Sequence, residues 1–448
     1  MKQERFSFII SGMNTTCDIA IVGAGAAGLA AAISAAQAAR KAEAQLRVVM
    51  LEASDRVGRS ILKTGNGRCN FSNADIAEGP AVANYRNAGF VWAAFEALNR
   101  AFPEPDFNDP VLAFFEDAGL EWRQEDDGRR YPLSNKASTV LDVLRAEAAR
   151  LGVEEVCDTR VAAIEAPVDP DKPFTLRLAD GQFWRAAAVI VACGGAAVEH
   201  IELANMRPEA VQPILGPLAV ASADQAFTRE LDNIRVRCCV SLFRDEAGEL
   251  IHKHTESGEL LFRPYGVSGI CVFNLSRLAQ AGDYVQINFL QMGDLDHSHD
   301  YLKSRFAGLT EHLGQAPTYE QFMRGLVVPR LTDAVLKRAG CNAQDTADVE
   351  KLFQILCLCS LEVAGMGPTD VCQVQRGGYA PNQFDAATMQ SRVQPGLYVA
   401  GEALDVDGPC GGYNLHWAWA SGLLAGHAAQ AYVNALSSSQ TLSHVGTE

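Results

Sequence analysis

Three glycines near the N-terminus of the 448-residue chain have the spacing of a phosphate-binding turn. Gly23, Gly25 and Gly28 form a GxGxxG pattern between an apolar, β-prone run at 19–22 and an Ala-rich segment at 29–41 that we expect to be helical. In this context the first glycine permits the turn, the second lets a pyrophosphate approach the backbone, and the third allows close helix-to-strand packing. The helix N-terminus supplies N–H groups and a positive dipole end, so the phosphate needs no lysine.

A carboxylate closes this unit. Glu52 follows a second expected strand at 46–51, at the distance of an acid that binds both ribose hydroxyls and repels a 2′-phosphate. Glycine-rich helix starts also occur without ligands, but the strand, the helix and the terminal acid supply the context that the motif requires. The pattern therefore favours FAD or NAD over NADP.

Cationic side chains follow in a loop that is too rich in Gly and Asn to be a regular element. Arg59, Lys63 and Arg68 would bring positive charge to a bound pyrophosphate. A solvated loop without a ligand is the alternative interpretation. The loop ends in Cys69 and Asn70, which would lie beside the same ligand.

Two later strands end in glycine, as parallel strands do where their carboxyl ends meet a cofactor. The apolar run 189–193 stops at Gly194, and the run 396–400 stops at Gly401 and Glu402. We therefore expect both strand ends to contact the cofactor.

A second helix is expected to begin at about Asn414, after a glycine-rich turn. Its N-terminus would point into the same site. The helix dipole would then stabilise negative charge on a reduced flavin ring.

Composition and charge narrow the class of protein. With 48% hydrophobic and 21% charged residues, the chain is typical of a soluble enzyme. The formal net charge of −16 argues against broad binding to nucleic acid or to an anionic membrane. No run of apolar residues is long enough for a membrane span.

The twelve cysteines are scattered and often lie in apolar runs, as Cys17, Cys193 and Cys271 do. There is no CxxC motif, and no cysteine pairs have zinc spacing. This usage is typical of reduced thiols in a cytoplasmic protein, and we expect no metal site. It also disfavours a disulfide reductase, since no redox-active pair follows the glycine motif.

The sequence pattern changes twice along the chain. We expect an inserted antiparallel β domain at 196–292, with its strands at 236–243, 259–262, 271–275 and 284–289. Apolar residues at helical spacing then predict a helical cap over the cofactor at 293–360. The cofactor domain would be discontinuous, comprising 14–195 and 361–436, and a Ser-rich disordered tail would occupy 437–448.

Four stretches resemble a family of bacterial FAD flavoproteins that includes bile-acid enone reductases, aminoacetone oxidases and a ribosomal-RNA dihydrouridine synthase. They are the N-terminal unit ending in GRSILKTGNGRCN, RRYPLSNKAS from Arg129, GELLFRPYGVSG from Gly258, and GLYVAGEALDVDGPCGGYNLHWAWASG from Gly396. They span most of the chain in the family's order. The last stretch and the GRCN loop are the most specific.

The resemblance implies an α/β fold, with a Rossmann-like FAD-binding domain (a parallel sheet with an antiparallel β layer) and inserted β-rich and helical domains. It also implies that Val161 lies near the adenine. The remaining FAD contacts would be Gly23, Gly25, Ala26, Gly28, Glu52, Arg59, Lys63, Arg68, Cys69, Asn70, Gly401, Glu402, Asn414 and Leu415.

Two positions depart from the family pattern. After Gly195 the chain lacks the family's Gly-Asp-Gly segment, and His416 stands where the family often has Gln. FAD binding is still expected. The substrate cannot be taken from the resemblance.

Few side chains near the expected flavin could move a proton. A flavin carries out the redox step itself, so the protein must position a substrate and transfer one proton. Cys69 in the glycine loop and Tyr413 before the last helix are the candidate donors, with packing roles as the alternatives. His416 could titrate near neutrality, but a structural role is favoured for it.

Three reactions are compatible with these residues. In the leading one, NAD(P)H binds transiently, because no second nucleotide fold is present, and hydride passes through flavin N5 to an enone-type C=C bond of a small molecule. In the second, a small amine is oxidised and oxygen reoxidises the flavin, releasing peroxide. The third is RNA modification, which the net charge of −16 disfavours. The sequence leaves the substrate and the oligomeric state open.

Overall fold

The computed structural model describes residues 15–77, 79–103, 109–169, 172–203 and 205–445. The contacts within it divide the chain into two compact units. We call the first, residues up to 212 and from 375 onward, the Rossmann unit. We call the second, Pro213–Val374, the insert.

An eight-stranded sheet forms the centre of the Rossmann unit. Its strands run in the order β10-β7-β8-β9-β1-β2-β6, and β19 pairs with the carboxyl-terminal part of β9. Neighbours among β1, β2, β6, β9 and β19 are parallel, whereas β8 is antiparallel to both β7 and β9. The strands are β1 (Thr16–Val22), β2 (Val48–Leu51), β6 (Glu154–Val156), β7 (Val161–Glu165), β8 (Phe174–Leu178), β9 (Phe183–Val191), β10 (Glu202–Leu203) and β19 (Leu397–Val399). The predicted α/β fold with a parallel sheet and an antiparallel layer is confirmed.

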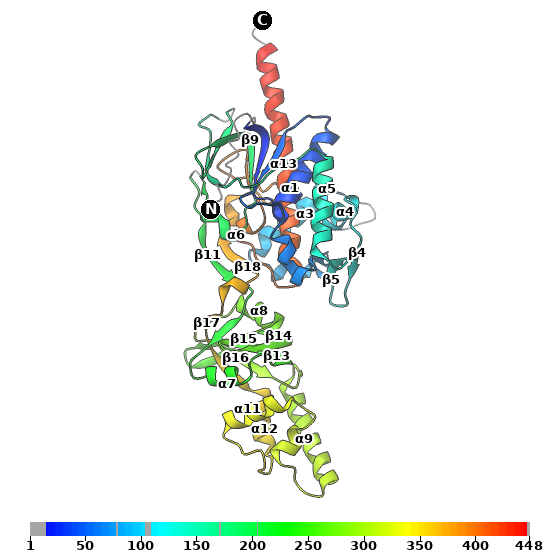
Figure 1. Ribbon diagram of the computed structural model, residues 1–448, viewed down its shortest axis with the longest axis vertical. Coiled ribbons are helices and arrows are strands. Elements are labelled where there is room, and N and C mark those ends of the chain that lie inside the picture. The colour runs from blue at the N-terminus through cyan, green and yellow to red at the C-terminus, as the bar shows by residue number, and fades with distance from the viewer. Residues whose placement is uncertain (1–14, 78, 104–108, 170–171, 204, 446–448) are drawn as a thin grey trace, which may run out of the picture. The chain divides into compact units, whose positions relative to one another are not determined.

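Helix α1 (Ala26–Lys41) and helix α13 (Tyr413–Val445) pack along one another in the Rossmann unit (Figure 1). Small residues bring them close. A Cβ on Gly422 or Gly426 of α13 would lie 2.5 or 2.2 Å from a backbone oxygen of α1. The Ala-rich character of α1 therefore reflects helix-to-helix packing as well as helix propensity.

The end of α13 differs from the expected disordered tail at 437–448, because the helix continues through Val445. No glycine or proline interrupts residues 427–445. The Ser438 hydroxyl donates to the carbonyl of Asn434, 2.9 Å away, so serine is accommodated within the helix.

Smaller elements complete the Rossmann unit. A three-stranded antiparallel sheet has the order β3-β5-β4, in which β4 and β5 form a hairpin, and β11 pairs with β18 in a two-stranded sheet. These strands are β3 (Ser72–Asn73), β4 (Trp122–Gln124), β5 (Arg129–Pro132), β11 (Glu209–Ile214) and β18 (Val374–Gly378). The helices are α2 (Ala74–Ala77), α3 (Ala88–Ala101), α4 (Pro110–Asp117), α5 (Ala137–Arg150) and α6 (Gly195–Val198), with 3₁₀ turns η1 (Ile61–Gly67), η2 (Pro80–Asn84), η4 (Pro381–Gln383) and η5 (Gly401–Ala403).

The insert contains a closed barrel in the order β12-β15-β14-β13-β16-β17. Its strands are β12 (Leu218–Val220), β13 (Arg235–Glu246), β14 (Glu249–Arg263), β15 (Gly266–Ser268), β16 (Tyr284–Asn288) and β17 (Cys359–Met366). Its helices are α7 (Gln225–Glu230), α8 (Ile270–Ser276), α9 (Leu295–Leu313), α10 (Tyr319–Met323), α11 (Pro329–Ala339) and α12 (Val349–Cys357), with the 3₁₀ turn η3 (Thr369–Val371). None of the helices described in either unit has the length and apolar character needed to span a bilayer.

The division of the chain differs from the predicted boundaries. Strand β17 pairs with β12 and β16 and thereby closes the barrel, although residues from 361 onward were expected in the cofactor domain. Residues 196–212, expected in the β domain, belong to the Rossmann unit. Helices and barrel share one hydrophobic core, in which Leu302 and Leu352 pack with Leu242 and Leu361, so the expected β and helical domains form one unit.

One expected strand in the insert is wrong. Residues 271–275 belong to helix α8. Gly269 precedes the helix with φ +108°, a conformation that interrupts extended backbone. A short apolar run cannot by itself distinguish a strand from a buried helix.

Candidate cofactor and active site

The turn between β1 and α1 has one open glycine and two that packing requires. A Cβ on Gly23, at φ +99°, would lie 2.6 Å from the oxygen of Ala192, and a Cβ on Gly28 would lie 2.0 Å from the oxygen of Gly23. Gly25 has only Ser60 Oγ nearby, 3.3 Å from its Cβ position. No side chain caps the helix that begins at Ala26, so its first N–H groups are available to an anion.

Glu52 lies at the carboxyl end of β2 and is oriented by backbone N–H groups. Its two carboxylate oxygens accept hydrogen bonds from the Ala24 N–H at 2.9 Å and the Ser54 N–H at 2.8 Å. Its carbonyl accepts the Thr159 N–H at 2.8 Å, two residues before Val161, which begins β7 and is buried. The carboxylate retains lone pairs that ribose hydroxyls could use.

The three predicted cations have different environments. Arg59 and Lys63 are exposed. Arg68 stacks on the Tyr131 ring, with its guanidinium carbon 4.3 Å from the ring centroid, and its nitrogens lie 3.1 Å from the Tyr131 hydroxyl and 3.4 Å from Glu125. The structure therefore fixes Arg68 against the hairpin of β4 and β5.

The GNGRCN loop has an unusual backbone. Gly65, Asn66, Gly67 and Cys69 all have positive φ, between 56° and 81°, which turns the chain sharply and encloses the Cys69 side chain completely. Burial raises the pKa of the Cys69 thiol to about 12, partly offset by a hydrogen bond with Thr64. The thiol is therefore protonated at neutral pH and is a weak acid.

Asn70 carries an unsatisfied polar atom. Its side chain is 8% exposed, and its Oδ1 has no hydrogen-bond partner among the described residues. A Cβ on Gly412 would lie 3.0 Å from this oxygen and 2.4 Å from the carbonyl oxygen of Ser72. A buried acceptor without a partner is costly, so an N–H group of a bound ligand would stabilise it.

The strand ends at Gly194 and Gly401 have the expected glycine conformations. Gly194 has φ +77°, and a Cβ there would meet nothing within 4 Å, so one side of this turn is open. The Gly401 N–H donates to Ser421 Oγ at 2.9 Å. Glu402 accepts the Gln375 N–H at 3.0 Å, and burial raises the pKa of its carboxyl to about 7.

The start of α13 is held by Asn414. Its side-chain oxygen accepts the Gly408 N–H at 2.8 Å, and its side-chain nitrogen donates to the Gly408 carbonyl at 2.9 Å. Leu415 is half-buried in the first turn. This clamp fixes the glycine-rich turn before the helix.

Tyr413 is buried beside this turn. Its carbonyl accepts the Tyr85 hydroxyl at 2.7 Å, and burial raises the pKa of its phenol. The Cβ position of Gly411 lies 3.9 Å from the Tyr413 ring, 3.6 Å from Arg129 Nε and 3.5 Å from the Asn73 amide nitrogen. Side-chain atoms of Tyr413 and Arg129 thus both approach the Gly411 turn.

Sequence reasoning did not single out Arg129 or Asn73 as site residues. The Asn73 side chain donates to the carbonyl of Gly411 at 2.9 Å. Arg129 on β5 is the strand partner of Asn73 on β3. The only sequence signals were that Arg129 begins the RRYPLSNKAS segment and that Asn73 lies three residues after the end of the GRCN loop.

His416 is buried in the first turn of α13. Its Nδ1 lies 2.9 Å from Ser72 Oγ, and its ring packs against Phe95 with 5.3 Å between ring centroids. Burial lowers the pKa of the imidazole, so it is neutral at physiological pH. Within the described part of the chain, no three His, Cys, Asp or Glu side chains gather as metal ligands would.

These residues fit a dinucleotide cofactor. The open turn at Gly25 suits a pyrophosphate and Glu52 suits a ribose. The unsatisfied oxygen of Asn70 suits an N–H of a flavin ring, and the start of α13 suits its electron-rich edge.

Comparison with known proteins assigns the chain to a family. A family model described as "HI0933-like protein Rossmann domain" matches residues 17–428. The chain belongs to the HI0933-like family. It is 32% identical to the 3-dehydro-bile acid delta(4,6)-reductase of Clostridium scindens, over 92% of this chain and 98% of that protein.

Two further relatives are ribosomal RNA dihydrouridine synthases. That of Escherichia coli is 27% identical over 90% of this chain and 96% of that protein, and that of Haemophilus influenzae is 24% identical over 90% and 95%. This HI0933-like chain is an FAD-dependent oxidoreductase with a Rossmann-type fold.

Proposed function

We propose that this HI0933-like protein reduces an activated, enone-type C=C bond of a small molecule with electrons from NAD(P)H. The observation that carries the proposal is that side-chain atoms of Tyr413 and Arg129 both approach Gly411, in the turn before α13. The similarity to the bile acid reductase over nearly the full length of both chains supports it.

Reduction of a C=C bond conjugated to a carbonyl requires a hydride at the β-carbon and a proton at the α-carbon, with negative charge developing on the carbonyl oxygen. FAD, when bound, supplies the transfer of hydride from NAD(P)H to the substrate. The protein must therefore supply the proton and stabilise the oxygen.

Tyr413 and Arg129 are suited to these two tasks. The raised pKa of the Tyr413 phenol keeps its proton in place at neutral pH, and the guanidinium of Arg129 offers N–H donors to an oxygen. In this proposal Tyr413 protonates the α-carbon and Arg129 faces the carbonyl oxygen. Cys69 is the alternative donor, but its thiol is fully enclosed.

The residues that would hold FAD remain those expected from the sequence. The glycine turn at Gly23, Gly25 and Gly28 would bind the pyrophosphate and Glu52 the ribose. Asn70 and the first turn of α13 would contact the flavin ring.

A second substrate class is favoured by the two relatives that are dihydrouridine synthases. Dihydrouridine differs from uridine by two hydrogens added across a C=C bond that is conjugated to a carbonyl. The same proton donor and cation would serve this reaction. The net charge of −16 opposes RNA binding, so the small-molecule substrate is preferred.

Anaerobic stopped-flow absorbance tests the proposal. FAD-loaded protein is mixed with NADH or NADPH, and then with cyclohex-2-enone, a 3-keto-4-ene steroid or unmodified ribosomal RNA. We expect a nicotinamide to bleach the flavin band and an enone to restore it. Reoxidation by RNA alone would assign the second substrate class. No bleaching by either nicotinamide, together with reduction by small amines and peroxide release in air, would instead establish an amine oxidase.

Tyr413→Phe tests the proton donor. We expect reoxidation by the enone to slow by about 100-fold or more, the range typical of a lost general acid, while reduction by NAD(P)H is unchanged. Tyr85→Phe is the matched control, because it also removes a buried phenol hydroxyl, the one that donates to the Tyr413 carbonyl. Equal slowing in both variants would show that packing alone is responsible.

A further inference from the structure

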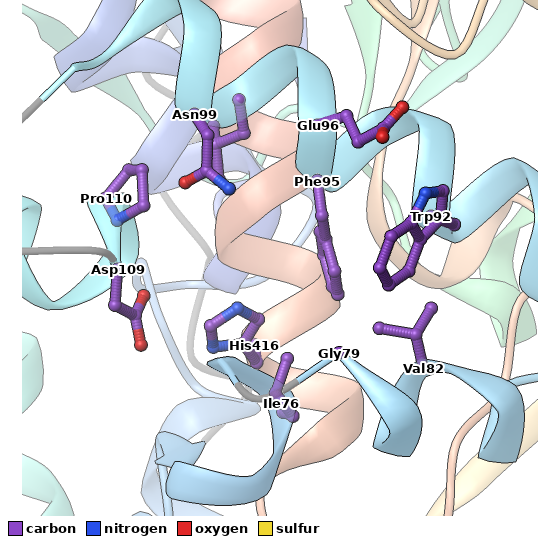
Figure 2. Close-up of a pocket in the computed structure, with 11 residues that line it drawn as sticks. Ile76, Gly79, Val82, Trp92, Phe95, Glu96, Asn99, Asp109, Pro110 and His416 are labelled. Carbon is purple, nitrogen blue, oxygen red and sulfur yellow. The ribbon is translucent and has the colours of Figure 1, made fainter.

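The Rossmann unit contains a cavity that is lined by residues other than the expected cofactor contacts. It has a volume of about 130 Å³ and lies between α3, η2, the start of α4 and α13, as Figure 2 shows. It is lined by Ile76, Gly79, Val82, Trp92, Phe95, Glu96, Leu98, Asn99, Asp109, Pro110 and His416. None of the residues expected to contact FAD lines this cavity, so we treat it as separate from the cofactor site.

The size of the cavity limits what it can hold. A cavity of about 150 Å³ lined by apolar side chains holds one benzene molecule, so this cavity is suited to a single six-membered ring. Its walls are largely apolar, with Ile76, Val82 and Leu98 all buried. Trp92 is 47% exposed, and it stands with the exposed Glu96 and Asn99 at the rim. A ring could therefore enter without rearrangement of the core.

His416 provides a polar group inside the cavity. The side chain is 4% exposed, and Figure 2 shows its ring between Asp109 and Phe95. Nδ1 lies 2.9 Å from Ser72 Oγ, which leaves Nε2 as the ring nitrogen that a ligand in the cavity could use. An imidazole nitrogen can accept from or donate to a ligand hydroxyl, according to its tautomer.

The charges around the cavity oppose an anionic ligand. Asp109 Oδ2 is paired with Arg130 Nη1 at 2.7 Å, and Asp109 Oδ1 accepts the Val111 N–H at 3.1 Å, so this carboxylate is already bound on both oxygens. Glu96 adds a second negative charge at the rim, which opposes an anion. A hydroxyl both donates and accepts, so it pairs with Nε2 in either tautomer.

We propose that this cavity binds a neutral six-membered ring that carries one hydroxyl group, with the hydroxyl on His416 Nε2. Trp92 and Phe95 contribute aromatic walls. The site stands independently of the reaction proposed above, because none of its lining residues takes part in that reaction.

Phenol and toluene are probes of matched size that differ in the hydroxyl. Dissociation constants are measured on FAD-loaded protein by ligand-observed NMR. We expect saturable binding of both, with phenol binding about fivefold more tightly or better, as one net hydrogen bond allows. Absence of saturable binding, or equal affinities for the two probes, would overturn the proposal.

Two variants locate the effect. His416→Phe should bring the two affinities within about twofold of one another, since the ring remains and the hydrogen bond is lost. Trp92→Ala, at the exposed rim, should weaken both probes to the same degree. An unchanged preference for phenol in His416→Phe would show that the hydroxyl binds elsewhere.

A crystal of the unmodified protein soaked in phenol decides the matter if His416→Phe fails to retain FAD. Density for the ring in this cavity, with its oxygen at hydrogen-bond distance from Nε2, would support the proposal. Ordered phenol only at other places would refute it.

Discussion

Asp224 and Asp283 of the insert, and Glu52 and Glu402 of the Rossmann unit, all accept backbone N–H groups, but of these four only the two in the insert also have a cationic partner. In the insert, Asp224 accepts the Glu362 N–H and lies 2.6 Å from Arg338, and Asp283 lies 2.8 Å from Arg244. In the Rossmann unit, Glu52 and Glu402 accept backbone N–H groups, and no ion pair involves them among the described residues.

This difference separates structural carboxylates from carboxylates that are available to a ligand. A buried charge paired with a guanidinium fixes the fold and has little remaining capacity. An unpaired carboxylate at a strand end costs stability in the free protein and retains lone pairs for a ligand. The two units can also be compared through their glycines. Packing requires Gly28 at the cofactor turn, whereas no neighbour crowds Gly308 of α9.

The largest effect is expected from Gly28→Ala. The added Cβ would lie 2.0 Å from the backbone oxygen of Gly23, and a backbone atom cannot move aside as a flexible side chain can. We expect a loss of about 3 kcal/mol or more in unfolding free energy and loss of FAD from the purified protein. Urea unfolding and the flavin absorbance measure the two. Full retention of FAD at unchanged stability would show that the turn is not packed as described.

Glu52→Gln compared with Asp224→Asn tests the difference between a carboxylate without a cation and one that is paired with a cation. Hydrogen bonds to a charged group contribute about 1.5–3 kcal/mol, so Glu52→Gln should weaken FAD binding by roughly 10-fold to 100-fold. Asp224→Asn should lower the unfolding free energy by a similar amount and leave FAD affinity unchanged. FAD titrations followed by flavin fluorescence, with urea unfolding of both variants, make the comparison. Equal effects of both variants on FAD binding would contradict the proposed difference between Glu52 and Asp224.

Sequence reasoning succeeded where one local βαβ unit dictates the residue types. Gly23, Gly25 and Gly28 lie between β1 and α1 and Glu52 follows β2, as expected, and Gly23 and Gly28 are approached by backbone atoms at 2.6 and 2.0 Å. Their contacts with FAD stay predictions. The parallel sheet followed from the apolar strands that end in glycine.

It failed where non-local packing decides the structure. The apolar run 271–275 is compatible with either a helix or a strand, and its helical form depends on the turn at Gly269. Strand β17 belongs to the barrel because β12 and β16 lie on either side of it, which no local pattern encodes. The approach of Arg129 and Tyr413 to Gly411 likewise joins segments that are nearly 300 residues apart, so their pairing could not be predicted.

Glu402→Gln should make stability depend less on pH. Burial raises the pKa of Glu402 from 4.5 to about 7, so the folded state binds the proton more tightly than the unfolded state does. Stability of the FAD-free wild type therefore falls as pH rises from about 4.5 to about 7, by at most about 3 kcal/mol. Glutamine does not titrate. The advantage of the variant over wild type in thermal unfolding should grow between pH 5 and pH 8, and a constant difference would contradict the raised pKa.

The smallest effect is expected from Gly308→Ala, the counterpart of Gly28→Ala in the insert. Gly308 lies inside helix α9, is exposed and would gain a Cβ that meets nothing within 4 Å. Alanine loses less conformational entropy in a helix, so we expect a gain of about 0.5–1 kcal/mol in unfolding free energy, with FAD affinity unchanged. Urea unfolding measures it beside Gly28→Ala. A lower unfolding free energy for Gly28→Ala and a higher one for Gly308→Ala would show that close packing requires glycine at the cofactor turn but not in α9. A lower unfolding free energy for both variants would mean that another element packs over Gly308.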